Sequence, residues 1–115
     1  RMNDNVSKPV RKAEVYYNKI HAGILLLNRG RYTFIYDREY MFSNHPSIAL
    51  DMPKRNRFFC SPYLFPFFQG LLPEGANRAF LCRCLGISSS DKFTMLVKLA
   101  NHETIGAITV REEDV

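Results

Sequence analysis

The chain has 115 residues, of which 46% are hydrophobic and 23% are charged, and its formal net charge is +5. This length fits one domain, and this composition excludes a disordered or fibrous protein. No stretch approaches the roughly 18–20 consecutive apolar residues that a membrane span needs, so the sequence predicts a cytoplasmic protein without membrane contact.

Most of the positive charge lies at the start of the chain. Residues 1–12 contain four basic residues and one Asp, a net of +3 out of the total of +5, which leaves +2 for residues 13–115. Because residues 1–12 have no apolar periodicity, we expect a disordered basic tail followed by one folded domain over residues 13–115. A nucleic-acid-binding arm is the alternative for the tail.

The three cysteines do not form a metal motif. Cys82 and Cys84 are two residues apart, so on a helix they point to different sides, and Cys60 is remote from both in the sequence. The three histidines have no ligand-type spacing to any cysteine. The sequence therefore predicts no metal, no cofactor and a reducing compartment, with Cys82 and Cys84 as buried helix thiols.

The first third of the domain is predicted to be an antiparallel meander of three strands, over residues 13–18, 20–27 and 31–36. These segments are rich in β-branched, aromatic and aliphatic residues, and the third alternates Tyr32, Phe34 and Tyr36 with residues of the opposite face. Asn18-Lys19 and the segment 28–30 are the expected turns, because Asn and Gly tolerate a positive φ.

The rest of the domain is predominantly helical by pattern. Residues 37–46 are predicted to be a loop or short helical turn, residues 47–50 a strand, and residues 63–70 an apolar segment that ends at Gly70. A helix over residues 76–85 would place Phe80, Leu81, Cys84 and Leu85 on one apolar stripe. A further helix over residues 91–100, with N-cap candidates at residues 88–90, precedes a returning strand over residues 105–110.

These elements predict an α+β fold. The small antiparallel sheet is either open or barrel-like, and it carries two or three C-terminal helices and a returning strand.

Catalytic motifs are missing from the sequence. The six glycines are isolated, and no phosphate-binding loop, GxSxG elbow or HExxH motif is present. Glu74 lies between Pro73 and Gly75, just before a predicted helix, so we interpret it as a helix-terminal carboxylate and not as a catalytic acid. We therefore predict that the chain is not an enzyme.

Residues 66–78 read PFFQGLLPEGANR. This segment resembles the "PFF-x-x-LLPEG-x-x-R" signature of the HipA N-terminal domain family. Weaker similarity to the family extends over about residues 13–110 and includes the opening hairpin, the third strand, the segment 47–53, the helix 91–100 and the closing residues 105–108.

The resemblance implies a function in a toxin–antitoxin system. In full-length HipA toxins this region precedes a kinase body, and a free-standing copy is similar to HipS of tripartite HipBST systems. The implied role is an antitoxin that binds and neutralises a HipT-like serine/threonine kinase. A HipB-like helix-turn-helix protein would join the larger complex, so that this chain would meet DNA only indirectly.

The predicted partner-binding site is the signature segment and the helix start that follows it. Pro73 and Gly75 would fix a protruding turn that presents Glu74 and Ala76 at a low entropic cost of docking. The family often has an aromatic residue at the position of Ala76, so the mode of kinase inhibition here is open. The candidate residues are Phe67, Phe68, Leu71, Pro73, Glu74, Gly75, Ala76, Asn77 and Arg78, of which the three apolar residues are either partner anchors or core.

Two other functions remain open at this point. The first alternative is that the chain is an N-terminal regulatory fragment of a full-length HipA-type kinase. In the second it is a basic nucleic-acid-binding protein, supported by the mixture of basic and aromatic residues at Lys54, Arg55, Arg57, Phe58 and Phe59.

Overall fold

The fold is a single antiparallel sheet of five strands with helices on one face, in a computed structural model that describes residues 10–99 and 108–112. The strand order is β4-β3-β2-β1-β5. In chain order the strands are β1 (Arg11–Tyr17), β2 (Ile20–Asn28), β3 (Arg31–Tyr36), β4 (Phe58–Ser61) and β5 (Ile108–Glu112).

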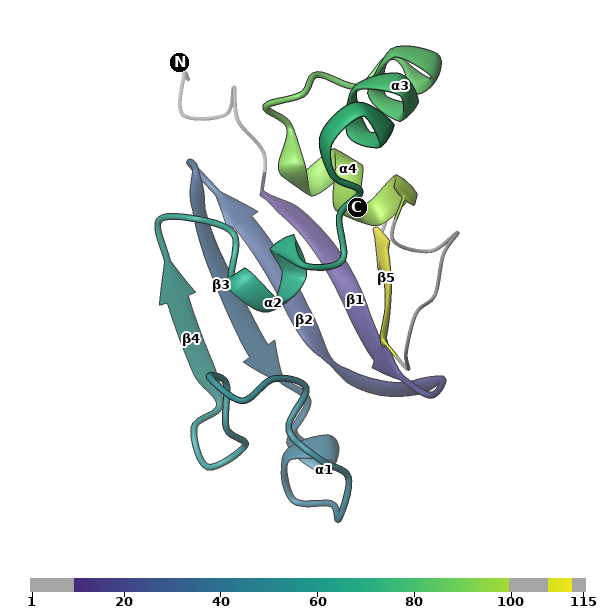
Figure 1. Ribbon diagram of the computed structural model, residues 1–115. Coiled ribbons are helices and arrows are strands. Elements are labelled where there is room, and N and C mark those ends of the chain that lie inside the picture. The colour runs from purple at the N-terminus through teal and green to yellow at the C-terminus, as the bar shows by residue number, and fades with distance from the viewer. Residues whose placement is uncertain (1–9, 100–107, 113–115) are drawn as a thin grey trace.

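The helices are short and unevenly placed. They are α1 (Arg38–Met41), α2 (Pro66–Gln69), α3 (Gly75–Leu85) and α4 (Lys92–Leu99). Figure 1 shows α2 and α4 against the same face of the sheet, α3 at one end of the molecule, and α1 at the opposite end. None of the helices in the described ranges is both long enough and apolar enough to cross a membrane.

The predicted α+β class and the three-strand meander are confirmed. Asn18 and Lys19 have φ values of 49° and 69°, and Arg29 and Gly30 have φ values of 55° and 80°. Each pair forms a two-residue hairpin turn with two positive φ angles, whose twist matches that of the strands it joins. The sheet is open, with β4 and β5 as its edges, so it does not close into a barrel.

The strand predicted over residues 47–50 is wrong, and β4 over residues 58–61 was missed. Ile48 is buried, but its N–H donates to the Tyr36 hydroxyl at 3.0 Å instead of to a neighbouring strand. Leu50 is fully exposed. The segment therefore crosses an end of the sheet as a loop, and the chain returns to pair with β3 only at Phe58.

The C-terminal part agrees with the prediction in its elements and differs at their ends. Asp91, rather than a residue within 88–90, caps α4, because its Oδ1 accepts from Thr94 N at 3.1 Å. The returning strand is observed as β5, whereas residues 105–107 of the predicted strand lie outside the described residues. Residues 111 and 112, which follow the predicted end of the strand at residue 110, are part of β5.

The start of the sheet lies earlier than predicted. Arg11 is part of β1 and makes a two-point ion pair with Glu112, with Nε–Oε2 and Nη2–Oε1 distances of 2.9 and 2.8 Å. Its Nη1 also donates to Thr94 Oγ1 at 2.7 Å, and the guanidinium lies 4.6 Å from the centre of the Phe93 ring. Arg11 thus joins β1, β5 and α4 and does not belong to a tail. Residues 1–9 of the predicted tail lie outside the described residues.

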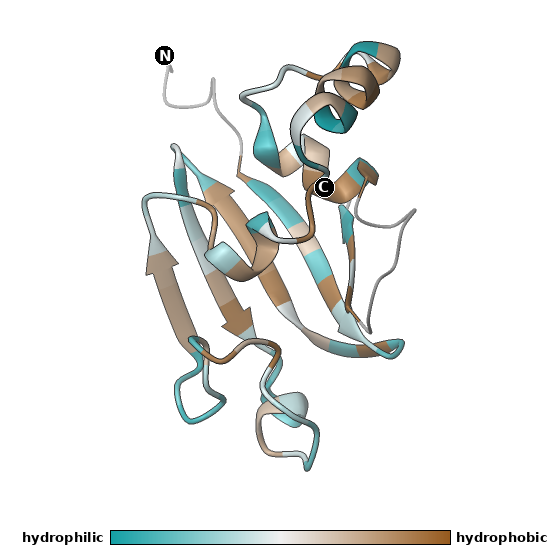
Figure 2. Cartoon of the chain, in the orientation of Figure 1, coloured by the Kyte–Doolittle hydropathy of each residue, from teal (hydrophilic) through white to brown (hydrophobic). Residues whose placement is uncertain are grey.

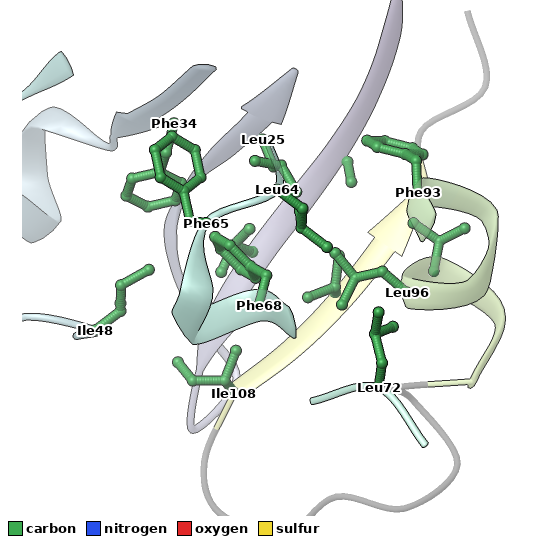
Figure 3. Close-up of a cluster of buried hydrophobic side chains, with 14 of the residues drawn as sticks. Leu25, Phe34, Ile48, Leu64, Phe65, Phe68, Leu72, Phe93, Leu96 and Ile108 are labelled. Carbon is green, nitrogen blue, oxygen red and sulfur yellow. The ribbon is translucent and has the colours of Figure 1, made fainter. Parts of the chain in front are cut away.

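The core lies between the sheet and the α2–α4 layer. Ala13, Leu25, Phe34 and Phe59 are successive partners across four strands, and the first three are fully buried. Figure 3 shows Phe68 of α2 in the same cluster as Leu25 and Phe34, together with Phe93 and Leu96 of α4. This packing attaches the segment after β4 firmly to the sheet.

Gly23 leaves the space that the Phe34 ring occupies in this core. A Cβ at Gly23 would be 2.4 Å from the Ile35 carbonyl oxygen and 2.7 Å from the Phe34 ring. Because the closer atom belongs to the backbone of a central strand, it cannot easily move aside.

We predict that Gly23→Ala lowers the free energy of unfolding by about 2 kcal/mol, the usual range for overpacking a core. Gly70→Ala is the matched control, since a Cβ there is 3.4 Å from its nearest neighbour. Chemical denaturation measures both variants. Equal stability of the two would contradict the steric role of Gly23.

Two buried tyrosines anchor the loop between β3 and β4. The Tyr36 hydroxyl donates to Met52 O at 2.5 Å, and the Tyr40 hydroxyl donates to Pro46 O at 2.7 Å. Their rings are stacked with centres 6.0 Å apart. Burial raises the pKa of Tyr40 to about 12 and also raises the pKa of Tyr36.

The raised pKa of Tyr40 predicts a loss of stability at high pH. In the unfolded chain the phenol ionises near pH 10, whereas in the folded protein it keeps its proton to about pH 12. The contribution of protonated Tyr40 to the free energy of unfolding is therefore complete below pH 10, and it falls as the pH rises from 10 to 12. Unfolding free energies across this interval should fall less steeply for Tyr40→Phe than for the wild type. Tyr63→Phe, at an exposed tyrosine, should follow the wild type.

Candidate partner-binding site

The signature segment makes a rigid corner between α2 and α3. Leu72 is 4% exposed and holds one side of the corner in the core. After it, Glu74 is extended (φ −123°, ψ 156°) and Gly75 is left-handed (φ 57°), so α3 begins directly at the corner. A side chain at Gly75 would be strained by this φ, which explains a glycine at this position.

Arg78 holds the corner from inside α3. Its Nε donates to the Pro73 carbonyl at 2.9 Å, and its backbone N–H donates to the Glu74 carbonyl at 3.3 Å. Arg78 is half-buried. This geometry gives Arg78 a role in shaping the corner, and its predicted role in partner binding stays a prediction.

The tip of the corner is open to solvent. Glu74, Gly75, Ala76 and Asn77 are all exposed, and Pro73 is partly exposed. The Glu74 side chain makes no capping hydrogen bond to α3, so its role as a helix-terminal carboxylate does not extend to capping. Four consecutive residues of the predicted site are thus exposed at the start of α3.

The apolar members of the predicted site divide into two groups. Phe68 is 0% exposed and lies 6.0 Å from Phe34, ring centre to ring centre, so it is a core residue and cannot meet a partner in this fold. Phe67 and Leu71 are partly buried and pack against the core from its edge. These two residues keep some surface beside the corner.

Of the apolar stripe predicted for α3, Leu81 packs against the core, whereas the other three residues face solvent. Cys82 is the buried residue of α3, whereas Phe80 and Leu85 are 55% and 52% exposed. Cys84 is also exposed, so the expectation of two buried helix thiols holds for Cys82 alone. The side of α3 that meets the body of the domain therefore contains Leu81 and Cys82, and only Leu81 belongs to the predicted stripe.

The far end of α3 is held in the same way as the corner. Gly86 is the left-handed C-cap (φ 68°), and its N–H donates to the Cys82 carbonyl. Ile87 follows, 9% exposed, and its N–H donates to the same carbonyl at 2.8 Å. A left-handed residue followed by a buried apolar residue is the usual C-terminal stop of a helix.

Comparison with known proteins assigns this arrangement to a family. The HipA N-terminal domain family, Couple_hipA, matches residues 13–111. The chain belongs to this family. It therefore corresponds to the N-terminal domain of HipA and not to the kinase domain.

Two relatives give the extent of the likeness. A solved structure, the N-terminal domain of HipA toxin, is 26% identical, has a TM-score of 0.69 and matches over 98% of both chains. The putative kinase Y4mE of Sinorhizobium fredii (strain NBRC 101917 / NGR234) is 34% identical over 67 residues, which is 58% of this chain. The match covers 16% of the length of that kinase.

The titratable cluster of this HipA N-terminal domain lies far from the corner in the sequence. The His21 ring lies between two carboxylates, with Nδ1 3.2 Å from Asp37 Oδ1 and Nε2 in contact with Glu14 Oε1. Both ring nitrogens are therefore occupied by acids, and neither faces a hydroxyl or thiol nucleophile. Within the described residues, no group of three or more acidic, His or Cys side chains could hold a metal ion.

The left-handed Gly75 gives a direct test of the corner. We predict that Gly75→Ala destabilises the domain by about 1–2 kcal/mol, because a Cβ disfavours this φ, while Gly75→Asn costs less, because Asn visits the left-handed region more readily. Thermal unfolding of the two variants measures the difference. A Gly75→Ala protein as stable as the wild type would mean that the corner does not need this conformation.

Proposed function

We propose that this HipA N-terminal domain is a non-catalytic antitoxin module that binds and neutralises a HipT-like serine/threonine kinase, in the manner implied by its similarity to HipS. Family membership supports the relation to HipA. The proposal extends it to a partner and an activity, including the assembly with a HipB-like DNA-binding protein in the cytoplasm.

The observation that carries the proposal is the exposed, rigid corner at residues 73–77. Its backbone is fixed by Gly75, by the Arg78–Pro73 hydrogen bond and by buried Leu72, so little conformational entropy is lost on docking. Glu74 at its tip offers a carboxylate without a capping partner in α3. An exposed, preorganised surface of this kind suits docking to a protein partner.

A second candidate is the same domain acting in cis, as the N-terminal regulatory part of a longer HipA-type kinase. The match to a putative kinase of which it covers only 16% favours this alternative. Both candidates require the same contact with a kinase body and differ in whether a peptide chain joins the two parts.

Nucleic-acid binding has weaker support. Lys54 Nζ donates to Ser43 O at 2.7 Å and also to His45 O, and Arg57 Nε donates to Tyr36 O at 3.0 Å. Two of the three basic residues that suggested phosphate contacts therefore hold the loop between β3 and β4 in place. Phe59 faces the core, which removes one of the two candidate stacking rings.

Co-expression with the HipA-type kinase encoded at the same locus tests the proposal. We expect this chain to restore growth that the kinase alone arrests, and to purify with the kinase. Growth arrest that persists together with no co-purification would contradict both candidates. A fused in-frame kinase at the locus would favour the cis form.

Glu74→Ala should weaken the complex and leave the domain folded. The carboxylate is exposed, so its loss should change stability by less than about 0.5 kcal/mol, while the lost contact should raise Kd about tenfold. Glu39→Ala, at an exposed carboxylate on α1, is the matched control. Calorimetric titration against the kinase measures both. Equal affinity of the two variants would remove Glu74 from the interface.

A further inference from the structure

The helix α3 receives little packing from its own domain. It has 11 residues, of which Cys82 is buried and Leu81 packs, partly buried, against the core. Helices shorter than about 12–15 residues are marginal in water, and in proteins they are stabilised mainly by packing of an apolar face. The outer side of α3 lacks such packing in the isolated chain.

The exposed side of α3 is nevertheless apolar. Ala76, Phe80 and Cys84 follow one another at intervals of four residues, so they lie in one row, which we call the outward stripe. All three are exposed, and the row lies about 160° around the helix from Cys82. Figure 2 shows hydrophobic colouring along much of α3.

An exposed row of apolar residues, such as the outward stripe, differs from single exposed apolar residues. Phe42 and Leu50 are also exposed, but they lie in the loop region between α1 and β4, where isolated apolar residues on a surface are ordinary. The outward stripe has an aromatic residue at its centre, 55% exposed, and it begins at Ala76 in the corner. The stripe and the corner therefore form one continuous surface.

The charges of α3 indicate the chemistry of the surface that would cover it. The helix sequence GANRAFLCRCL contains two arginines and no acidic residue. Arg83 is exposed and three residues from Phe80, so it lies beside the outward stripe. The complementary surface is an apolar groove with an acidic rim, which is the helix-in-groove mode of recognition.

We infer that the outward stripe, Ala76, Phe80 and Cys84, docks into an apolar, acid-rimmed groove on the kinase body. This inference rests on the proposed function and adds the surface that provides most of the apolar contact. The kinase body is the occupant because the related putative kinase has most of its chain outside the matched domain, and because the stripe continues the corner.

Phe80→Ser tests the stripe against a matched control, Phe42→Ser, which makes the same substitution at an exposed Phe near the other end of the molecule. The probe is the HipA-type kinase encoded at the same locus, titrated with each purified domain. We expect Phe80→Ser to raise Kd by about tenfold or more and Phe42→Ser to leave it within about twofold. Circular dichroism should show both variants folded.

A second pair of variants tests the charge of the groove. Arg83→Glu should raise the Kd for the kinase, as Phe80→Ser does. Arg55→Glu makes the same charge reversal at an exposed residue in the loop before β4, and it should leave the Kd unchanged. This pair keeps the inference testable if Phe80→Ser fails to fold. Undiminished binding by Arg83→Glu would exclude an acidic rim.

The possible results separate the inference from the proposed function. If the wild type binds the kinase and Phe80→Ser binds equally well, the inference is wrong and the proposed function stands. If the wild type does not bind at all, the proposed function fails and the inference with it. If Phe80→Ser instead abolishes self-association in sedimentation, the stripe joins two copies of this chain and the inference is wrong.

Discussion

The attachment of α3 at its two ends is the constraint on which the rest of the functional surface depends. Leu72 enters the core before the helix, Ile87 enters it after the helix, and Cys82 touches it between them. Because glycines at residues 75 and 86 take left-handed conformations, the chain leaves and re-enters the core sharply. The helix is thereby fixed in direction while most of its surface stays free, as a binding element requires.

The sheet and the family could be read from the sequence because both leave local signals. The alternation of Tyr32, Phe34 and Tyr36 defines one buried face, and the burial of Phe34 and Tyr36 confirms it. The turn at Asn18-Lys19 was predictable from the tolerance of Asn for a positive φ. The corner was visible in the signature itself, since a Pro-Glu-Gly sequence after two leucines limits the chain to few conformations.

The errors came from long-range contacts that local patterns do not encode. Ile48 is apolar and buried, yet its backbone is satisfied by the Tyr36 hydroxyl, so the segment is a loop and the fourth strand begins ten residues later, at Phe58. In α3 the predicted apolar stripe meets the core only through Leu81, while its other members are exposed. The sequence shows which residues share a side of a helix, but the packing of Leu72 and Ile87 decides which side meets the core. The outward stripe lies opposite the buried Cys82, and this arrangement becomes visible only in the three-dimensional structure.

Family membership relates the chain to HipA, and the exposed corner and the outward stripe turn that relation into a proposal about contact with a kinase. Hydrogen–deuterium exchange of α3, in the free domain and in the presence of the kinase, tests that contact most directly. The account predicts rapid exchange along α3 in the free domain and strong protection across residues 76–85 in the complex, with little change at α1. Unchanged exchange along α3 in a saturated complex would contradict it.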